Sequence, residues 1–150
     1  MRAVIQRVSS ASLTIGGVKK AGIGRGFVVL LGIGVQDTAD DADWLCAKIA
    51  RFRVFADANG LMNLDLAEAG GELLLVSQFT LHASYKKGNR PSFLTAARPE
   101  QAITLYERCI ATLQELTGRA PQTGTFGADM QVSLTNDGPV TIIMDTQNKE

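Results

Sequence analysis

The residues best suited to chemistry gather at positions 77–81 (SQFTL), where polar side chains interrupt a strongly apolar run. Burying a hydroxyl or an amide without a partner is costly, so Ser77, Gln78 and Thr80 must either be satisfied within the core or face a cavity. Thr80 is a poorly equipped nucleophile, because the only base near it in sequence is His82. If the segment continues as a strand, Thr80 and His82 point to the same face.

His82 is the single histidine of the chain, and Cys46 and Cys109 are its two cysteines. These three residues cannot build the common four-ligand zinc site, and no GxSxG motif supports a histidine-based triad. Both cysteines lie in segments of helical periodicity, so we expect free, buried thiols in a reducing compartment. A nucleophilic cysteine paired with His82 has no local sequence support, and His82 is most simply interpreted as structural.

Two glycine-containing segments near the C-terminus could present backbone groups to a ligand. Residues 126–129 (FGAD) combine a ring that can stack on a base with a Gly-Ala backbone that permits close approach, although the pattern also suits a strand starting after a turn. Residues 135–140 (TNDGPV) predict a tight turn. An X-Pro bond is cis in only about 5% of cases, so the residues alone predict a trans Gly138–Pro139 bond.

Strands dominate the elements that must position these segments. They are indicated by alternating hydrophobicity, apolar runs and bounding glycines. The expected strands cover residues 2–8, 11–15, 27–35, 53–57, 72–81, 126–136 and 139–145. Turns are expected at Gly16–Gly17, at Asn59–Gly60 and at 137–139, where the last two strands would join as a hairpin.

Two helices complete the pattern. Thr38 opens the first, with Asp41 three residues later, and the second runs from Pro99 to a stop at Gly118. The apolar faces expected from helical spacing are Trp44, Leu45, Ile49 and Phe52 on the first helix, and Ile103, Tyr106, Ile110, Leu113 and Leu116 on the second. The predicted fold class is α+β, with mostly antiparallel sheets flanked by two helices.

The length of 150 residues suits one compact domain over residues 1–150, which buries about 70% of the surface of the unfolded chain. Residues 145–150 are expected to form a flexible tail. No apolar run reaches the roughly 18 residues of a membrane span, and the N-terminus does not resemble a signal peptide. We therefore expect a soluble protein of the cytoplasm.

The formal net charge is zero, which by itself argues against a nucleic-acid binder. The charges are segregated, however. Residues 1–36 contain five Lys or Arg and no acid, and residues 73–99 contain four and no acid. If these two basic segments lie side by side, they form a basic face suited to phosphate contacts. If they do not, each is simply solvated.

Taken together, these segments resemble the D-aminoacyl-tRNA deacylase family, also called the D-tyrosyl-tRNA deacylases. The resemblance runs from Met1 to about Asp145 and rests on the blocks MRAVIQRVSSAS, GGELLLVSQFTL, KKGNRPSF and TGTFGADMQVSLTNDGPVT, in that order. SQFTL combined with a C-terminal NDGPVT is highly specific. The SQFTL spelling also favours this subgroup over related deacylases with a different motif there.

The resemblance implies a homodimeric hydrolase that cleaves the ester between a D-amino acid and the terminal adenosine of tRNA and spares L-aminoacyl-tRNA. It implies no metal, no organic cofactor, and catalysis by backbone N–H groups assisted by the substrate's ribose 2′-hydroxyl. It also implies a cis Gly138–Pro139 bond that reaches into the partner subunit's active site and excludes L side chains. Glycine has no side chain to exclude, so we expect activity on glycyl-tRNA.

By matching position, the resemblance implies roles for three groups of residues. The ester pocket and catalytic segment comprise Ser77, Gln78, Phe79 and Thr80. The substrate-binding set comprises Phe126, Gly127, Ala128 and Met130 near the adenosine, with Asn136, and with Arg7 bracing the Gly-Pro turn. The candidate contacts to the tRNA backbone are Lys86, Lys87 and Arg90.

Two alternatives stay open. In the first, the substrate is the same but Thr80 acts as a covalent nucleophile. In the second, the chain is a non-enzymatic RNA-binding or replication-associated module whose basic segments carry the function. Such a module would not require a polar SQFTL segment opposite a Gly-Pro turn.

Overall fold

The computed structural model of the protein describes residues 1–149. Its main sheet is built around β1 (Arg2–Ile15), which pairs on one edge with β3 (Gly26–Gly32) and β2 (Val18–Ile23), and on the other with β8 (Gln131–Asp145). The two strands predicted at 2–8 and 11–15 are therefore one. The first half of β1 pairs with β3 and the second half with β2, but β8 runs along both halves and keeps the strand continuous. The predicted turn between β1 and β2 is confirmed.

The sheet is parallel on the side away from β8. β6 (Glu72–Ser77) lies parallel to β3, and β7 (Gln122–Thr123) lies parallel to β6, whereas all pairs of β1 are antiparallel. The expected mostly antiparallel sheet therefore has one parallel side, formed by β3, β6 and β7. β3 is buried on both faces, as its unbroken apolar run predicted.

The strand predicted at 72–81 is too long. It ends at Ser77, and the chain turns into the short 3-10 helix η1 (Phe79–His82). The reason is that β3 itself ends at Gly32, so the bond from the Gln78 N–H to the Leu31 carbonyl oxygen, at 2.7 Å, closes the ladder between the two strands. Thr80 and His82 therefore do not alternate along a strand, and that part of the prediction is wrong.

The predicted hairpin at 137–139 is also wrong. β8 pairs with β1 in the same antiparallel sense on both sides of the segment, with Asn136 opposite Val8 and Thr141 opposite Gln6. The four intervening residues, 137–140, leave the register and form a bulge, which we call the Gly-Pro bulge. A proline suits this place, because it has no N–H to donate to a ladder. The Gly138–Pro139 peptide bond is cis, against the prediction from the residues alone and in agreement with the resemblance.

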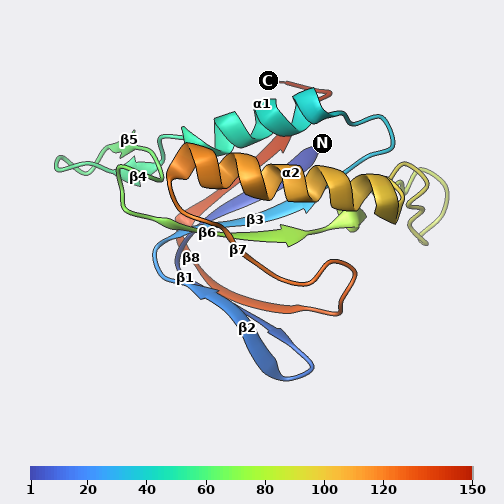
Figure 1. Ribbon diagram of the computed structural model, residues 1–150, viewed down its shortest axis with the longest axis horizontal. Helices are drawn as coiled ribbons and strands as arrows, with labels where there is room; N and C mark the ends of the chain where they lie inside the picture. The colour runs from blue at the N-terminus through green and yellow to red at the C-terminus, as the bar shows by residue number, and fades with distance from the viewer. Residues whose placement is uncertain (150) are drawn as a thin grey trace.

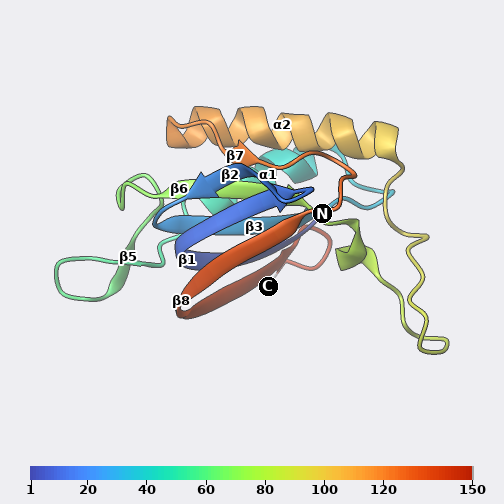
Figure 2. The same cartoon turned by 90° about the horizontal axis from the view of Figure 1, so that it is seen from below.

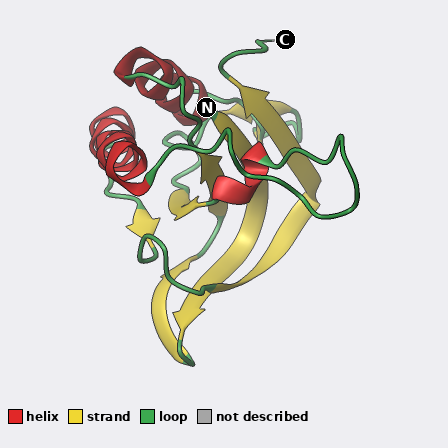
Figure 3. Ribbon diagram, turned by 90° about the vertical axis from the view of Figure 1, so that its right-hand side faces the viewer, coloured by secondary structure: helices red, strands yellow, loops and turns green. Residues whose placement is uncertain are grey.

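The helices α1 (Ala39–Ala50) and α2 (Pro99–Thr117) lie side by side over one face of the sheet (Figures 1 and 3). Their predicted ends are confirmed. The Thr38 N–H donates to the Asp41 carboxylate at 2.9 Å, Pro99 occupies the first turn of α2, and Gly118 ends it with a left-handed φ of 72°.

The buried face of α2 is rotated from the one predicted. Ile103 and Leu116 are each 37% exposed, whereas the small residues Ala102 and Cys109 are buried. Small side chains let α2 approach α1 closely, and Cys46 and Cys109 meet where the two helices touch, with the Cys46 sulfur 3.8 Å from the Cys109 carbonyl oxygen. Both thiols are free and buried, as predicted.

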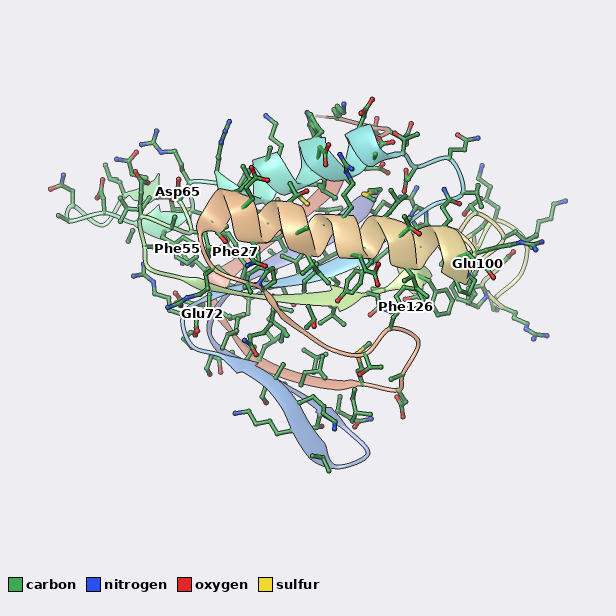
Figure 4. The ribbon with its side chains drawn as sticks, in the orientation of Figure 1. Phe27, Phe55, Asp65, Glu72, Glu100 and Phe126 are labelled. Atoms are coloured by element: carbon green, nitrogen blue, oxygen red, sulfur yellow. The ribbon has the colours of Figure 1, made fainter. Side chains whose placement is uncertain are left out.

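Apolar side chains form a large cluster between the sheet and the helices and a smaller one among β1, β2, β3 and β6. These four strands lie close together in Figure 2. In the large cluster, the rings of Phe27 and Phe55 lie 4.9 Å apart (Figure 4). Phe55 belongs to a separate small hairpin of β4 (Phe55–Ala56) and β5 (Met62–Leu64), and β5 was not predicted.

The expected tail from residue 145 is anchored at its start. Asp145 ends β8, and the buried Thr146 donates its N–H to the Met1 carbonyl oxygen at 2.8 Å. Glu150 lies outside the described residues. Among the helices described, none is both long and apolar enough to cross a membrane.

Candidate functional site

A cleft of about 660 Å³ opens at the carboxyl end of β6, beside the start of α2. Three segments far apart in sequence line it: the end of β6 with η1, the approach to α2, and the loop before β8. The lining side chains include Ser77, Gln78, Phe79, Phe93, Arg98, Phe126, Gly127, Ala128, Asp129 and Met130. The fold thus brings together most of the predicted ester-pocket and adenosine-binding residues, which are about fifty positions apart in the chain.

The end of β6 forms one wall of the cleft. Ser77 is half-buried opposite Leu31, and Phe79 is 57% exposed, with its ring edge-on to Phe93 at 5.1 Å. The Gln78 side-chain amide donates to the Thr80 hydroxyl at 2.6 Å. Thr80 itself is exposed and is not among the lining residues, so of the four predicted catalytic positions it is the one that lies outside the cleft.

The opposite wall is a tight turn before β8. The Ala128 N–H donates to the Thr125 carbonyl oxygen at 3.1 Å, and Gly127 has a left-handed φ of 76°. Phe126 lies under α2 (Figure 4), where its ring is 6.1 Å from that of Tyr106. The Tyr106 hydroxyl donates to the Leu75 carbonyl oxygen at 2.8 Å, and burial raises the pKa of Tyr106 to about 12, which keeps it protonated as a donor.

His82 is not placed to activate Thr80. Its ring is buried against Gly32 and Gly34 at the end of β3, whereas the Thr80 hydroxyl is exposed and bonded to Gln78. Burial lowers the pKa of His82 from its ordinary value. In the part of the chain that is described, no three His, Cys, Asp or Glu side chains come together as metal ligands would.

The Gly-Pro bulge lies away from this cleft. No residue from 136 to 140 lines it among those described. Arg7, which contacts the bulge, stands opposite Phe27 on β3, four positions from the Leu31 that pairs with Ser77. Four residues of strand span about 13 Å. Gly138 and Pro139 are both exposed, so the bulge faces outward from the chain.

Two predicted residues hold the bulge in shape. Arg7 Nε donates to the Asp137 carbonyl oxygen at 3.0 Å, and Arg7 Nη1 donates to the Val54 carbonyl oxygen. Asn136 Oδ1 accepts the Val140 N–H at 2.9 Å. Asn136 and Arg7 therefore lie at the bulge and not at the cleft, unlike the predicted substrate-binding residues Phe126, Gly127, Ala128 and Met130.

The predicted basic residues do not gather on one face. Lys86, Lys87 and Arg90 lie on an exposed loop between Ser84 and Ser92, whose backbones bond to each other. Lys19 and Lys20 lie on β2, just after the turn of the β1–β2 hairpin, and that turn is at a different end of the molecule (Figures 1 and 2). The loop leads into Phe93 at the cleft, so the basic segment nearest to the cleft is residues 73–99.

The sequence pattern missed several lining residues. Phe93 and Asp129 lie within the KKGNRPSF and FGAD segments but were given no role. Arg98 stands before Pro99 at the start of α2, where no periodicity singles it out. Gly124 is a second omission: a Cβ there would collide with the Met130 sulfur and come within 2.9 Å of Leu13, so this position keeps Met130 at the cleft. A glycine two residues before FGAD was the available signal.

Comparisons with known proteins agree with one another. The family model described as D-Tyr-tRNA(Tyr) deacylase matches residues 4–145. Curated relatives named D-aminoacyl-tRNA deacylase, from Bacteroides thetaiotaomicron and Phocaeicola vulgatus, are 57% and 58% identical over the full length of both chains.

Two solved structures resemble the fold closely. One, named c-Myc DNA Unwinding Element Binding Protein, superposes with a TM-score of 0.90 at 42% identity, covering 97% of this chain and 98% of the other. A probable eukaryotic D-amino acid tRNA deacylase gives 0.81 at 19% identity, covering 95% and 97%, a likeness of fold. The family match over residues 4–145, a range that includes the segments lining the cleft and forming the bulge, assigns this protein to the D-Tyr-tRNA(Tyr) deacylase family.

Proposed function

We propose that this protein is a D-aminoacyl-tRNA deacylase of the cytoplasm, which hydrolyses the ester between a D-amino acid, or glycine, and the 3′-terminal adenosine of tRNA. The observation that carries the proposal is the cleft that joins Ser77, Gln78 and Phe79 to Phe126 and its neighbours. Family membership and the names of the full-length relatives support the same substrate class.

The loop before β8 suits the adenosine. Phe126 offers a ring on which a base can stack, and the Gly127–Ala128 backbone leaves room for close approach, since a Cβ on Gly127 would meet no atom within 4 Å. Met130 adds an adaptable apolar contact. A terminal adenosine is common to all tRNAs, so a site that reads it accepts many tRNA species.

The ester then lies against the end of β6. An aminoacyl ester is already activated, so a positioned water and backbone N–H groups that stabilise the oxyanion are sufficient, with the substrate's 2′-hydroxyl assisting. The bend from β6 into η1 supports this role, because the backbone leaves the strand ladder after Gln78 and becomes free to face a ligand. Removing one oxyanion donor typically slows an enzyme by about a hundredfold or more.

Chiral selection is assigned to the Gly-Pro bulge of a second copy of the chain. The bulge is exposed and remote from its own cleft, so it can act on an ester only across a homodimer. Its carbonyl groups would occupy the space that an L side chain needs and leave the D side chain unopposed. This exclusion penalises the wrong substrate without any contact to the right one.

A paired assay with D- and L-aminoacyl-tRNA tests the proposal, repeated with glycyl-tRNA and in the presence of a chelator. We expect hydrolysis of the D and glycyl esters, slow or no hydrolysis of the L ester, and no effect of chelator. Equal rates on D and L esters would contradict chiral editing, and untouched glycyl-tRNA would contradict steric exclusion.

A nucleic-acid-binding function is the second candidate, and one observation favours it. The 42% identical structure carries the name of a DNA-unwinding-element binding protein. A pure binder would have salt-sensitive affinity for nucleic acid and no turnover of D-aminoacyl-tRNA. The paired assay therefore separates the two functions.

A further inference from the structure

His82 ends the short helix η1 and lies flat against the end of β3. A Cβ on Gly34 would come within 2.9 Å of His82 Cε1, and one on Gly32 within 3.2 Å of His82 Cδ2. The side chain is 9% exposed, and its Nε2 is buried without a hydrogen-bond partner among the described residues. A buried polar atom without a partner is uncommon and calls for an explanation.

The position of η1 depends on this packing. At its start, the Gln78 N–H is bonded to the Leu31 carbonyl oxygen at 2.7 Å. At its end, Arg2 Nη1 donates to the Leu81 carbonyl oxygen at 2.9 Å, and the Thr95 hydroxyl donates to the His82 carbonyl oxygen at 3.1 Å. The imidazole fills the space between these attachments and β3. Phe79, three residues before His82 on the same turn, forms a wall of the cleft.

The charged surroundings of His82 suit its neutral form. The amino terminus of Met1 and the guanidinium of Arg2, the first residue of β1, contribute two positive groups, and Asp37, between β3 and α1, contributes one negative group. The Asp37 carboxylate already accepts the Met1 ammonium at 2.5 Å and the Gly34 N–H at 2.7 Å. Arg2 is itself paired with the Asp145 carboxylate at 2.9 Å. A protonated imidazole would therefore add a positive group beside two acids that are already paired, and its Nε2–H would have no acceptor among the described residues.

We propose that His82 is a positioning residue for the candidate site: its neutral imidazole seats η1 on Gly32 and Gly34, and its protonation in acid unseats η1 and slows deacylation. The effect on turnover rests on the proposed function, whereas the movement of η1 does not. Burial lowers the pKa of His82 more than the nearby Gly32 backbone and the charge of Asp37 raise it, and Arg2 and the amino terminus lower it further.

The pH dependence has a definite sign. A histidine with a lowered pKa binds its proton more readily in the unfolded chain, so its contribution to stability is complete above its ordinary pKa of about 6.5 and is lost as pH falls through the folded value. The seated form of η1 should decline over the same range.

The experiment uses the fact that His82 is the only histidine. In the full, untagged chain, a single set of imidazole NMR signals reports its titration, and the backbone amide signals of Phe79 and Leu81 report η1. We expect an imidazole midpoint below about 6.5, with the two amide signals moving at the same midpoint. An imidazole that titrates at or above its ordinary pKa, or amide signals that ignore the titration, would overturn the proposal even if the chain proved to have no deacylase activity.

Turnover supplies the second readout. The ratio of the wild-type rate to that of H82Q, which cannot titrate, should be constant above neutrality and fall about tenfold per pH unit below the His82 midpoint. Taking this ratio removes the pH dependence of the ester itself.

T95A is the matched control. It removes an attachment of the same turn without removing a titratable group, so its rate relative to wild type should be lower by the same factor at every pH. An identical acid limb in wild type and H82Q would contradict the proposal. If H82Q fails to fold, H82N replaces it, and the wild-type titration decides the movement of η1 without any variant.

Discussion

Arg7 donates a hydrogen bond from Nε to the backbone carbonyl oxygen of Asp137 at 3.0 Å, and the same nitrogen lies 3.5 Å from the Asp137 carboxylate. A second arm of the guanidinium bonds to the Val54 carbonyl oxygen, so one side chain joins β1, the loop before β4 and the Gly-Pro bulge. The Arg7 side chain is only 13% exposed. A planar fork of donors suits this task, because it reaches two carbonyl oxygens at once.

Arg7→Lys should loosen the bulge. Lysine keeps the charge but cannot serve both carbonyl groups, so we expect a decrease of about 1–2 kcal/mol in the free energy of unfolding, measured by urea denaturation. The ratio of D- to L-ester hydrolysis should fall as well. Arg53→Lys is the control. The Arg53 guanidinium also donates to two oxygens, but both belong to Asn63 on β5 and not to the Gly-Pro bulge. Arg53→Lys should leave the D-to-L ratio unchanged, and an unchanged ratio in Arg7→Lys would count against the bracing role.

Gly138→Ala should damage chiral discrimination. Gly138 has a φ of 132°, and a Cβ there would come within 2.9 Å of Val140 Cγ2 and 3.0 Å of Arg7 Nη2. The bulge must shift, and small misplacements of this kind can cost about a hundredfold in rate. We expect the D-to-L ratio to fall by about tenfold to a hundredfold.

Gly16→Ala is the matched control for that variant. Gly16 also has a positive φ, 57°, but a Cβ there would meet nothing within 4 Å. It should cost about 1 kcal/mol of stability without altering the ratio. If the two substitutions lowered the D-to-L ratio equally, the loss of discrimination would come from backbone strain and not from the position of Gly138 in the Gly-Pro bulge.

Thr80→Ala should leave deacylation nearly intact. The hydroxyl is exposed and bonded to Gln78, outside the cleft, so its removal should cost about 0.5 kcal/mol or less, a factor of two to three in rate. Single-turnover hydrolysis of a D-aminoacyl-tRNA measures this. Abolished activity in a variant with an unchanged circular dichroism spectrum would revive the covalent mechanism.

Replacing Lys86, Lys87 and Arg90 together with alanine should weaken tRNA binding and spare the chemical step. We expect a higher KM at unchanged kcat. The slope of log KM against log salt concentration should fall by about 0.7–0.9 for each phosphate that the variant no longer neutralises. Alanine at Lys19 and Lys20, on the distant hairpin, is the control and should change neither quantity. If both variants raise KM equally, the effect comes from overall charge.

The two thiols should be inert in the folded protein. Cys46 and Cys109 are buried where α1 packs on α2, and the bond to Cys109, with burial, raises the pKa of the Cys46 thiol. Since the thiolate is the reactive form, a thiol reagent should label neither residue in native buffer and both in denaturant. Rapid labelling of native protein would contradict the packing described for the two helices.

Local signals predicted much of this fold. The cap at Thr38, the stop at Gly118, the turn at Gly16–Gly17 and the doubly buried β3 all depend on a few neighbouring residues, and all are as expected. The errors arise where a distant partner decides. β1 is one strand because β8 spans both halves, and β6 stops early because β3 ends beside it.

The candidate site also has some features set by local sequence and others set by contacts between distant segments. The sequence by itself determined the chemistry available: a polar SQFTL segment, an aromatic-glycine pair at Phe126 and Gly127, a Gly-Pro motif, and only one histidine. Residue types set donors, acceptors and backbone freedom, and those properties need no fold.

Only the tertiary structure decided which of these groups meet. It gathers Ser77, Gln78 and Phe79 with Phe126 in one cleft, leaves Thr80 outside it, and separates the Gly-Pro bulge from that cleft within the chain. It also buries His82 against two glycines at the end of β3. These placements follow from strand register and helix packing between segments up to a hundred or more positions apart, which no local pattern encodes.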